Sequence, residues 1–295
     1  VDPTVGMRIS EDTTLCAGTF TMPTVSGVAA IEVVSSAVTL RCLGTVLDGT
    51  GSEALNPEEP TLGILVGAFD AVIVEGCWAL GYRHGFAAEG ATNLALRDVH
   101  MDDNFSDPNA DWGGDVSGGG ILFDSVSGGT IEASSASRNW NGIELRRSRD
   151  LVVTGNVANH CSNTGAILVD SHDSEVSDND FSWAIRGAVE YPNAWYGVDT
   201  KDSAGIIVEN ASTGILLEGN DTSYGGNGIF IRDLYGVCPT DNVVRGNLVS
   251  FSPHNGIECW CDRTVFDGNT AEACHYGIWT GGADHARIVN NVVHD

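Results

Sequence analysis

The sequence has very few positive charges. Lys and Arg number 14 against 40 Asp and Glu, which gives a formal net charge of −26, and Lys201 is the only lysine. A polyanion of this size repels the phosphates of nucleic acids and of anionic lipids, so we expect no nucleic acid among its partners. No apolar run approaches the ~20 residues of a membrane-spanning helix, so we also expect no membrane span.

Helical periodicity is missing as well. No segment places apolar residues at positions i, i+3, i+4 and i+7, which argues against a helical fold. Proline is scarce, with 8 residues, whereas glycine reaches 37 of 295 residues, well above the usual ~7%. Many glycines and few prolines predict tight turns rather than linkers, and a hydrophobic content of 42% argues against a disordered chain.

None of the 8 cysteines is spaced as C-x-x-C, which argues against a zinc ribbon and a thioredoxin-type redox site. An even number of cysteines suits an exported protein with disulfides, and we predict one between Cys16 and Cys42. Such a bond would close the N-terminal end of the fold against fraying. For Cys77 and Cys161 we predict reduced thiols buried in the core.

What the sequence does contain is a repeat of about 22 residues. A Gly-Ile/Ala-x-apolar pattern begins at Gly142, Gly165, Gly228, Gly256 and Gly277. An alternating apolar run ends at Asn156, Asn179, Asn220, Asn247, Asn269 and Asn291, so its spacings are 23, 41, 27, 22 and 22. The longer intervals indicate insertions into a regular period.

Each repeat is expected to form short strands separated by turns, with β-branched residues at alternate positions pointing inward. Asparagine tolerates the left-handed conformation of a turn and can stack as an amide ladder from coil to coil. We therefore predict an all-β fold, a single right-handed parallel β-helix, or solenoid, of about ten to twelve coils. It spans residues 1–295 as one domain, with turn insertions at 49–60, 102–119, 192–203 and 234–240.

Two groups of residues carry a family resemblance. The opening Cys16-Ala17-Gly18-Thr19-Phe20, the run Val38-Thr39-Leu40-Arg41-Cys42-Leu43-Gly44 and the later Gly-Ile-x-Leu coils resemble the pectin-lyase-like superfamily, in particular its NosD-like and mannuronan-epimerase-like branch. The resemblance covers nearly the whole chain and implies the fold and an exported protein. It carries over no catalytic set, because Ser252-Pro253-His254-Asn255 only approximates the epimerase D-P-H-D/E motif and the polygalacturonase motifs are absent as a set.

Stacking the coils on their glycines predicts an exposed face. One extra residue is allowed after Gly165 and Gly187, and the predicted outward columns are Glu144, Leu168, Glu190, Phe230, Glu258, Trp279 and, two residues later, Arg146, Asp170, Pro192, Arg232, Trp260, Gly281. Acids, arginines and aromatic rings on one sheet suit a glycan-binding groove. Arg146 beside Asp170 is equally well explained as a cross-strand ion pair.

Among these residues we predict Glu190, Arg232 and Glu258 as the main catalytic groups, with Glu144 and Asp170 as further candidates. Glu144 and Glu190 lie two coils apart, or about 9–10 Å, near the upper end of the ~6.5–9.5 Å that separates the carboxyl groups of an inverting glycosidase. The remaining face residues, Arg146, Phe230, Trp260 and Trp279, are predicted to bind substrate.

The insertion at 192–203 is predicted to flank this face. Trp195 and Tyr196 would contact substrate. Lys201, Arg232 or a Ca²⁺ ion could neutralise a uronate carboxylate, while His254 or another Arg or Lys removes the C5 proton. Carboxylates that could bind Ca²⁺ lie in the earlier insertion: Asp102, Asp103, Asp107, Asp111 and Asp115. His254 and His275 should stack on adjacent coils, where they form either a solvated turn column or, with Cys274 or Glu258, a metal site of unknown identity.

The leading hypothesis is an exported enzyme, secreted, periplasmic or on the cell surface, that acts on an extended polysaccharide as a lyase or glycoside hydrolase. The competing hypothesis is a non-catalytic β-helix that binds a glycan, a metal or a partner protein. The pattern stops at His294 and Asp295 without a capping helix, so we expect either a truncated chain or a subunit contact at the last coil.

Overall fold

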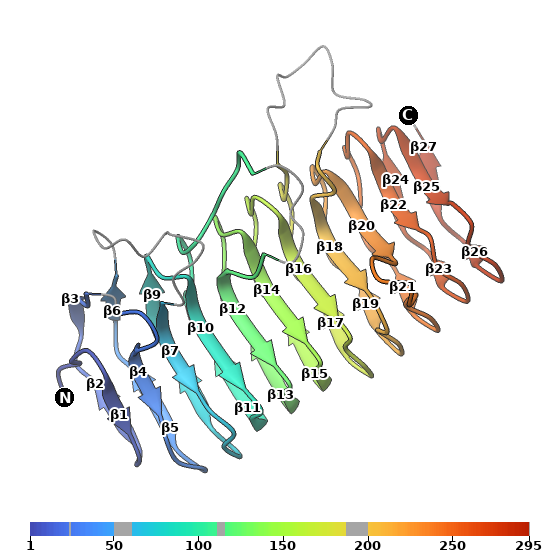
Figure 1. Cartoon of the computed structure of the whole chain (residues 1–295). Coiled ribbons are helices and arrows are strands. Elements are labelled where there is room, and N and C mark those ends of the chain that lie inside the picture. Colours follow the sequence, from blue (N-terminus) through green and yellow to red (C-terminus); the bar gives the residue numbers. More distant parts are fainter. Residues whose placement is uncertain (24, 50–60, 111–115, 187–199, 295) are drawn as a thin grey trace.

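The computed structural model describes residues 1–23, 25–49, 61–110, 116–186 and 200–294. Strands that are distant in the sequence stack side by side in parallel, and the two termini lie at opposite ends of the stack (Figure 1). Two faces of the stack are 11-stranded sheets, which we call sheets A and B. The predicted parallel β-helix is therefore confirmed, and the 11 coils that the described residues form fall within the predicted range.

The strands follow one another around the coil. Sheet A has the order β1 (Met7–Ile9), β4 (Ala29–Val33), β7 (Leu62–Val66), β10 (His84–Glu89), β12 (Gly119–Asp124), β14 (Asn141–Arg146), β16 (Thr164–Val169), β18 (Ala204–Glu209), β20 (Asn227–Arg232), β22 (Asn255–Cys259) and β25 (Tyr276–Thr280). Sheet B has the order β2 (Thr13–Leu15), β5 (Thr39–Cys42), β8 (Ile73–Glu75), β11 (Thr92–Arg97), β13 (Ser127–Glu132), β15 (Arg149–Thr154), β17 (Glu175–Ser177), β19 (Leu216–Glu218), β21 (Val243–Arg245), β23 (Val265–Asp267) and β26 (Arg287–Val289). The third side holds β3 (Gly18–Thr21), β6 (Thr45–Asp48) and β9 (Trp78–Leu80) near the N-terminus, and β24 (Thr270–Glu272) with β27 (Val292–His294) near the C-terminus.

The core lies inside the coils and is built from the inward positions of the repeat. One column of sheet A is in register through Ile121, Ile143, Ala166, Ile206, Ile229 and Ile257. All of these side chains are buried. Because neighbouring residues of a strand point to opposite faces, the residue after each of them points outward from sheet A.

The predicted asparagine ladder forms. Asn156 Nδ2 donates to Asn179 Oδ1 over 2.9 Å, and the same bond continues to Asn220, Asn247, Asn269 and Asn291 at 2.9–3.0 Å. The left-handed conformation, however, belongs to the residue before each ladder asparagine, which is Gly155, Asp178, Gly219, Gly246, Gly268 or Asn290. The ladder asparagines therefore serve as buried hydrogen-bonding groups rather than as left-handed turn residues.

The disulfide prediction was wrong. The structure has the disulfides Cys42–Cys77 and Cys238–Cys261, and Cys16 is a free, exposed thiol. Cys42 points into the core, where Cys77 of the next coil lies 4.8 Å away between Cα atoms, which is the ordinary spacing of stacked strands. Cys161 is a free, buried thiol as predicted, whereas the reduced thiol predicted for Cys77 was wrong because Cys77 is disulfide-bonded.

The described residues include no helix long and apolar enough to cross a membrane. Of the predicted insertions, positions 50–60, 111–115 and 192–199 lie outside the described residues. The insertion at 234–240 begins at the surface, with Leu234 and Tyr235 exposed. The last coil exposes Ile288, Val292 and Val293, and the predicted subunit contact there stays a prediction.

Candidate functional site

Glu258, on the outer face of β22, is held by three side chains. Asn255 Nδ2 donates to Oε2 over 2.6 Å, Trp260 Nε1 donates to Oε1 over 2.8 Å, and His254 Nδ1 lies 3.2 Å from Oε2. Burial raises the pKa of Glu258, but the hydrogen bonds from His254, Trp260 and Asn255 outweigh it and leave the pKa below its ordinary value. Glu258 is therefore a buried carboxylate that stays ionised.

Glu258 also orients the imidazole of His254. The ring nitrogen Nδ1 lies 3.2 Å from Glu258 Oε2, 2.9 Å from Asn227 Oδ1 and 3.1 Å from Asn255 Nδ2. These three side chains fix the orientation of the imidazole. The side chain of His254 is 40% exposed, so solvent and ligands reach it.

Arg232, on β20, joins two further carboxylates to this cluster. Its Nε donates to Glu209 Oε2 over 2.9 Å, and its Nη1 donates to Asp202 Oδ2 over 3.2 Å. Burial raises the pKa of Asp202; Arg232 opposes this shift and the charge of Glu258 adds to it. Asp202 thus retains its proton to higher pH than an ordinary aspartate, within the electrostatic field of Glu258 and His254. We call His254, Glu258, Asp202, Arg232 and Glu209 the acid–base cluster.

An apolar shelf adjoins the acid–base cluster on sheet A. Ile167, Ile207 and Phe230 are in register on β16, β18 and β20 at the outward position, yet all three are buried. They belong to an apolar cluster distinct from the core of the coils, and Trp260 packs against it. The Phe230 and Trp260 rings meet edge to face, with centroids 5.1 Å apart.

A second charged cluster lies on the same face, on β14. Glu144 is 1% exposed and accepts from Ser117 Oγ over 3.0 Å and from Asn141 Nδ2 over 3.1 Å. Arg146, two residues along the strand, forms an ion pair with the other carboxylate oxygen. Glu144 and Glu258 are four strands apart, or about 19 Å at the usual strand spacing, too far for an acid–base pair across one glycosidic bond.

The residues predicted for the two outward columns are correct on β14, β20 and β22 and wrong on β16 and β18. Residues placed as predicted are Glu144, Phe230, Glu258 and Trp279 in the first column and Arg146, Arg232 and Trp260 in the second. Ile167 and Val169 take the positions predicted for Leu168 and Asp170, because β16 has no extra residue after its glycine. A shift of one residue turns each side chain to the opposite face, and Leu168 is accordingly buried in the core.

Asp170 therefore does not join the face. It follows β16 in a turn with φ 50° and accepts from the Ala211 backbone N–H over 3.2 Å. The ion pair predicted between Arg146 and Asp170 is replaced by the pair of Arg146 with Glu144. Ile207 occupies the position predicted for Glu190.

Three predicted residues, Glu190, Trp195 and Tyr196, lie outside the described residues. Lys201 is half-buried in the turn before β18, and its backbone carbonyl accepts a hydrogen bond from Arg186.

The described part of the chain contains no group of three or more His, Cys, Asp or Glu side chains arranged to hold a metal ion, so neither predicted metal site is found there. Asp102 accepts from the Ser137 backbone N–H over 2.6 Å, and Asp103 forms an ion pair with Arg138 at 2.6 Å. Asp111 and Asp115 lie outside the described residues. His275 packs against Tyr276, with ring centroids 4.5 Å apart, whereas His254 turns toward Glu258.

Sequence reasoning missed Asp202, Glu209, His84, Arg83 and Ser117. One signal was available: the string Asn-Gly-Ile-Glu occurs at 141–144 and again at 255–258. In both copies the asparagine donates to the glutamate three residues later. For Asp202 the sequence carries no comparable signal, because its position depends on a turn in which Lys201 and Asp202 both have positive φ.

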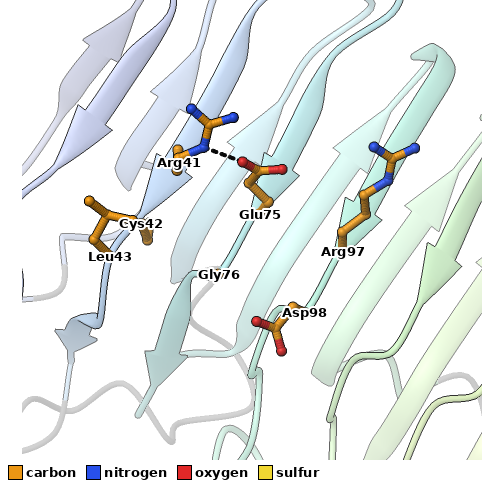
Figure 2. A pocket seen from close by; sticks show the side chains of 7 residues that line it. All are labelled: Arg41, Cys42, Leu43, Glu75, Gly76, Arg97 and Asp98. Atoms are coloured by element: carbon orange, nitrogen blue, oxygen red, sulfur yellow. Dashed lines mark hydrogen bonds and ion pairs between the residues drawn. The ribbon is translucent and has the colours of Figure 1, made fainter.

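A separate pocket of about 320 Å³ lies on the outer side of sheet B (Figure 2). Figure 2 shows Arg41 of β5 paired with Glu75 of β8, beside Arg97 of β11. These charged side chains are partly exposed and belong to surface ion pairs. The pocket therefore lacks the buried ionisable groups that mark the outer face of sheet A. Its lining is Arg41, Cys42, Leu43, Glu75, Gly76, Arg97 and Asp98.

Several solved structures share the fold. The chain is similar to the A-module of the mannuronan C-5 epimerase AlgE4 of Azotobacter vinelandii, with 14% identity, a TM-score of 0.63 and coverage of 97% of this chain and 80% of that one. It is also similar to the periplasmic alginate epimerase AlgG (12%, TM-score 0.60, 99% and 79%) and to a tailspike protein of E. coli bacteriophage HK620 in complex with a pentasaccharide (14%, TM-score 0.62, 97% and 55%).

The chain has no match among curated protein sequences. The family model described as "Right handed beta helix region" matches residues 58–194 and 196–295, which is most of the sequence. The chain therefore belongs to the right-handed β-helix family, and the handedness predicted from the sequence is confirmed.

Proposed function

We propose that the outer face of sheet A binds an extended polysaccharide and that the acid–base cluster transfers protons during its cleavage. The observation that carries the proposal is the pair formed by His254 and Glu258, in which a buried carboxylate orients a partly exposed imidazole. Trp260, which is partly exposed beside the buried apolar shelf, offers an aromatic ring of the kind on which sugar rings pack. One similar structure is named as a mannuronan epimerase, and the similar tailspike protein is in complex with a pentasaccharide. Both names agree with this proposal.

The reaction that these residues support best is β-elimination on a uronate-containing glycan. Elimination needs a base for the C5 proton and donors for the charge that develops on the carboxylate. His254, a partly exposed imidazole beside the buried carboxylate of Glu258, supplies the base. Asp202, whose pKa is raised by burial, supplies a proton, and Arg232 supplies positive charge that Glu209 and Asp202 hold in place.

Hydrolysis is the second candidate, and one observation favours it. Burial raises the pKa of Asp202, whereas hydrogen bonds lower that of Glu258 in the same cluster. A hydrolase needs one protonated carboxyl group as its general acid and one ionised carboxylate as its general base. Two acids whose pKa values are shifted in opposite directions fit these two roles.

Activity on a panel of acidic and neutral polysaccharides tests the proposal. Ultraviolet absorbance of unsaturated products together with new reducing ends indicates a lyase, whereas reducing ends alone indicate a hydrolase. His254→Gln and Asp202→Asn should each lower kcat at least ~100-fold, the usual scale for losing a general acid or base. Arg245→Gln, which breaks an exposed ion pair on sheet B, is the matched control and should keep full activity.

Two results would overturn the proposal. Full activity in both variants, with an unchanged melting temperature, would remove the acid–base cluster from the chemistry. Binding without turnover on every substrate would instead support the alternative of a non-catalytic glycan-binding protein.

We further infer that the protein works outside the cytoplasm and that residues 1–295 form one domain. Two disulfides suit an oxidising compartment, and one continuous apolar cluster runs from Ile9 to Ala271. Thiol counting by mass spectrometry on protein from its native host would contradict the location if all eight cysteines were reduced.

A further inference from the structure

The indole of Trp279, on the outer side of β25, lies over the backbone of Gly281. A Cβ added at Gly281 would lie 2.1 Å from Cη2 of the indole and 2.5 and 2.6 Å from the two neighbouring carbons, Cζ2 and Cζ3. Such a small increase from one carbon to its neighbours places the added atom above the ring plane and not beyond the ring edge. One face of the indole therefore rests on Gly281, and because Trp279 is 40% exposed, the opposite face is open to solvent.

Glycine at position 281 makes room for the indole and is not required by the backbone. Gly282 has a φ of 85°, in the region that favours glycine, whereas Gly281 has no positive φ. The three atoms nearest to a Cβ added at Gly281 all belong to the Trp279 ring. A larger residue at position 281 would therefore push the indole away from the strand.

The other strongly exposed tryptophans of the described chain have ring faces that are already in contact. Trp183 is stacked between two other rings of the turns, and Trp78 packs against His100 with ring centroids 4.3 Å apart. Trp279 contacts no other ring among the described residues. An open ring face that is held in one position offers a large contact area and loses little conformational freedom when a ligand binds.

This open indole face adjoins the acid–base cluster. Trp279 is in register with Glu258 on the neighbouring strand, so their backbones are about 4.8 Å apart. Residues 276–283 carry no charged side chain, and the ionised group in register with Trp279 is the carboxylate of Glu258. An anionic ligand on the indole would lie near this carboxylate without a cation on the same strand. The position therefore suits an uncharged ring.

We propose that Trp279 and Gly281 form a platform for one uncharged pyranose ring, next to the sugar bound at His254 and Glu258. The hydroxyl groups of a pyranose lie mainly at its edge, which leaves C–H groups to pack on the electron-rich face of an indole. Tyr276, on the same strand and 54% exposed, offers a hydroxyl that can donate to or accept from a sugar hydroxyl. The place of the cleaved bond rests on the proposed function, whereas sugar stacking itself does not. With a uronate at the acid–base cluster, the platform predicts a glycan that contains both uronates and neutral sugars.

Affinity electrophoresis tests the platform without any need for turnover. Native gels would contain glucuronoxylan or hyaluronan as mixed glycans, glucomannan as a neutral glycan, or alginate or polygalacturonate as polymers of uronates alone. At least one mixed or neutral glycan should retard the protein, and its concentration dependence gives a dissociation constant. Retardation by none of these glycans, or by the polymers of uronates alone, would overturn the proposal.

Variants of the two platform residues separate the ring from its position. Trp279→Ala removes the indole and should raise the dissociation constant about 10-fold, which corresponds to about 1.4 kcal/mol. Gly281→Ala keeps the indole but displaces it, so it should weaken binding to a similar extent. Trp279→Phe keeps an aromatic face and should retain most of the affinity. Trp78→Ala, which removes a tryptophan of similar exposure at the surface opposite the cluster's strands, on β9, is the matched control and should bind as the wild type does.

Equal dissociation constants for the wild type and Trp279→Ala would overturn the platform. Circular dichroism melting checks that each variant is folded, and if Gly281→Ala does not fold, the comparison of Trp279→Ala with Trp279→Phe still decides. The outcome is distinguishable from a failure of the proposed function. Binding that depends on Trp279 without turnover of any glycan would refute only the acid–base cluster, whereas turnover with binding that ignores Trp279 would refute only the platform.

Discussion

Each ladder asparagine uses both ends of its side-chain amide. Asn220 Nδ2 donates to the Val176 carbonyl over 2.8 Å and to Asn247 Oδ1 over 3.0 Å. Its Oδ1 accepts from the backbone N–H and the side-chain Nδ2 of Asn179. The side chain is 1% exposed, so water does not replace these bonds.

Asn220→Ala should therefore destabilise the protein strongly. The change leaves the amide of Asn179 and the carbonyl of Val176 buried without partners, at about 1–3 kcal/mol for each such group. Chemical denaturation should show a loss of at least ~2 kcal/mol. Asn290→Gly is the control, because Asn290 is exposed and has φ 56°; its effect should stay within about 0.5 kcal/mol. Equal stability of the two variants would contradict the structural role of the ladder.

Turns of stacked coils also contact one another on the outside of the β-helix, where four of them carry stacked aromatic side chains. His160, Trp183, Tyr224 and Phe251 stack with centroid separations of 5.9, 4.2 and 4.8 Å. All four residues have positive φ, between 56° and 61°. The left-handed backbone costs about 1–2 kcal/mol per residue, and each stacked ring pair returns about 0.5–1.5 kcal/mol.

Two variants of Tyr224 distinguish the cost of the left-handed backbone from the stabilisation by ring stacking. Tyr224→Gly loses the stacking and removes the backbone strain, so we expect a small change in stability. Tyr224→Val loses the stacking and places a β-branched residue at φ 61°, so it should be less stable than the glycine variant by at least ~1 kcal/mol. Denaturation midpoints of the two proteins measure the difference. A valine variant as stable as the glycine variant would show that this turn is not strained.

At the scale of the whole molecule, the many carboxylates make the stability of the fold depend on pH in the acidic range. Hydrogen bonds from Arg138, Arg245 and Arg263 lower the pKa values of Asp103, Glu218 and Asp241. A carboxylate with a lowered folded pKa stabilises the fold above its ordinary pKa, and that stabilisation is lost as the pH falls through the folded pKa. Asp202 has a raised pKa and acts in the opposite direction, but it is one group against several.

We therefore expect the melting temperature to be nearly constant above about pH 5 and to fall below about pH 4. Arg138→Gln should reduce the slope of this acid limb, because Asp103 then titrates nearer its ordinary value of 3.8. Melting followed by circular dichroism across this range measures both effects. An acid limb of equal slope in the variant would show that the pair of Arg138 with Asp103 contributes nothing to the dependence on pH.

Much of the fold follows from the sequence alone. The inward isoleucine column, the coil period and the asparagine ladder are periodic features, and each depends only on residues within one coil and on the alternation of side chains along a strand. Glu144, Phe230 and Glu258 were placed on the outer face by the same reasoning. The insertion at 234–240 lies between β20 and β22 and leaves the register within both strands unchanged.

Only the tertiary structure decided which residues meet across coils. The prediction took Gly187 as the start of a strand in the long interval, whereas β18 begins at Ala204 and places Ile207 at the position predicted for Glu190. In β16 a register error of one residue exchanged the two faces of the strand. Cys42 bonds to Cys77 rather than Cys16 because both point into the core from neighbouring coils. Asp202 reaches Arg232, and Arg83 and Ser117 reach Glu144, only after turns and strands far apart in the sequence have stacked. Such contacts depend on the geometry of the stack, which no local pattern in the sequence contains.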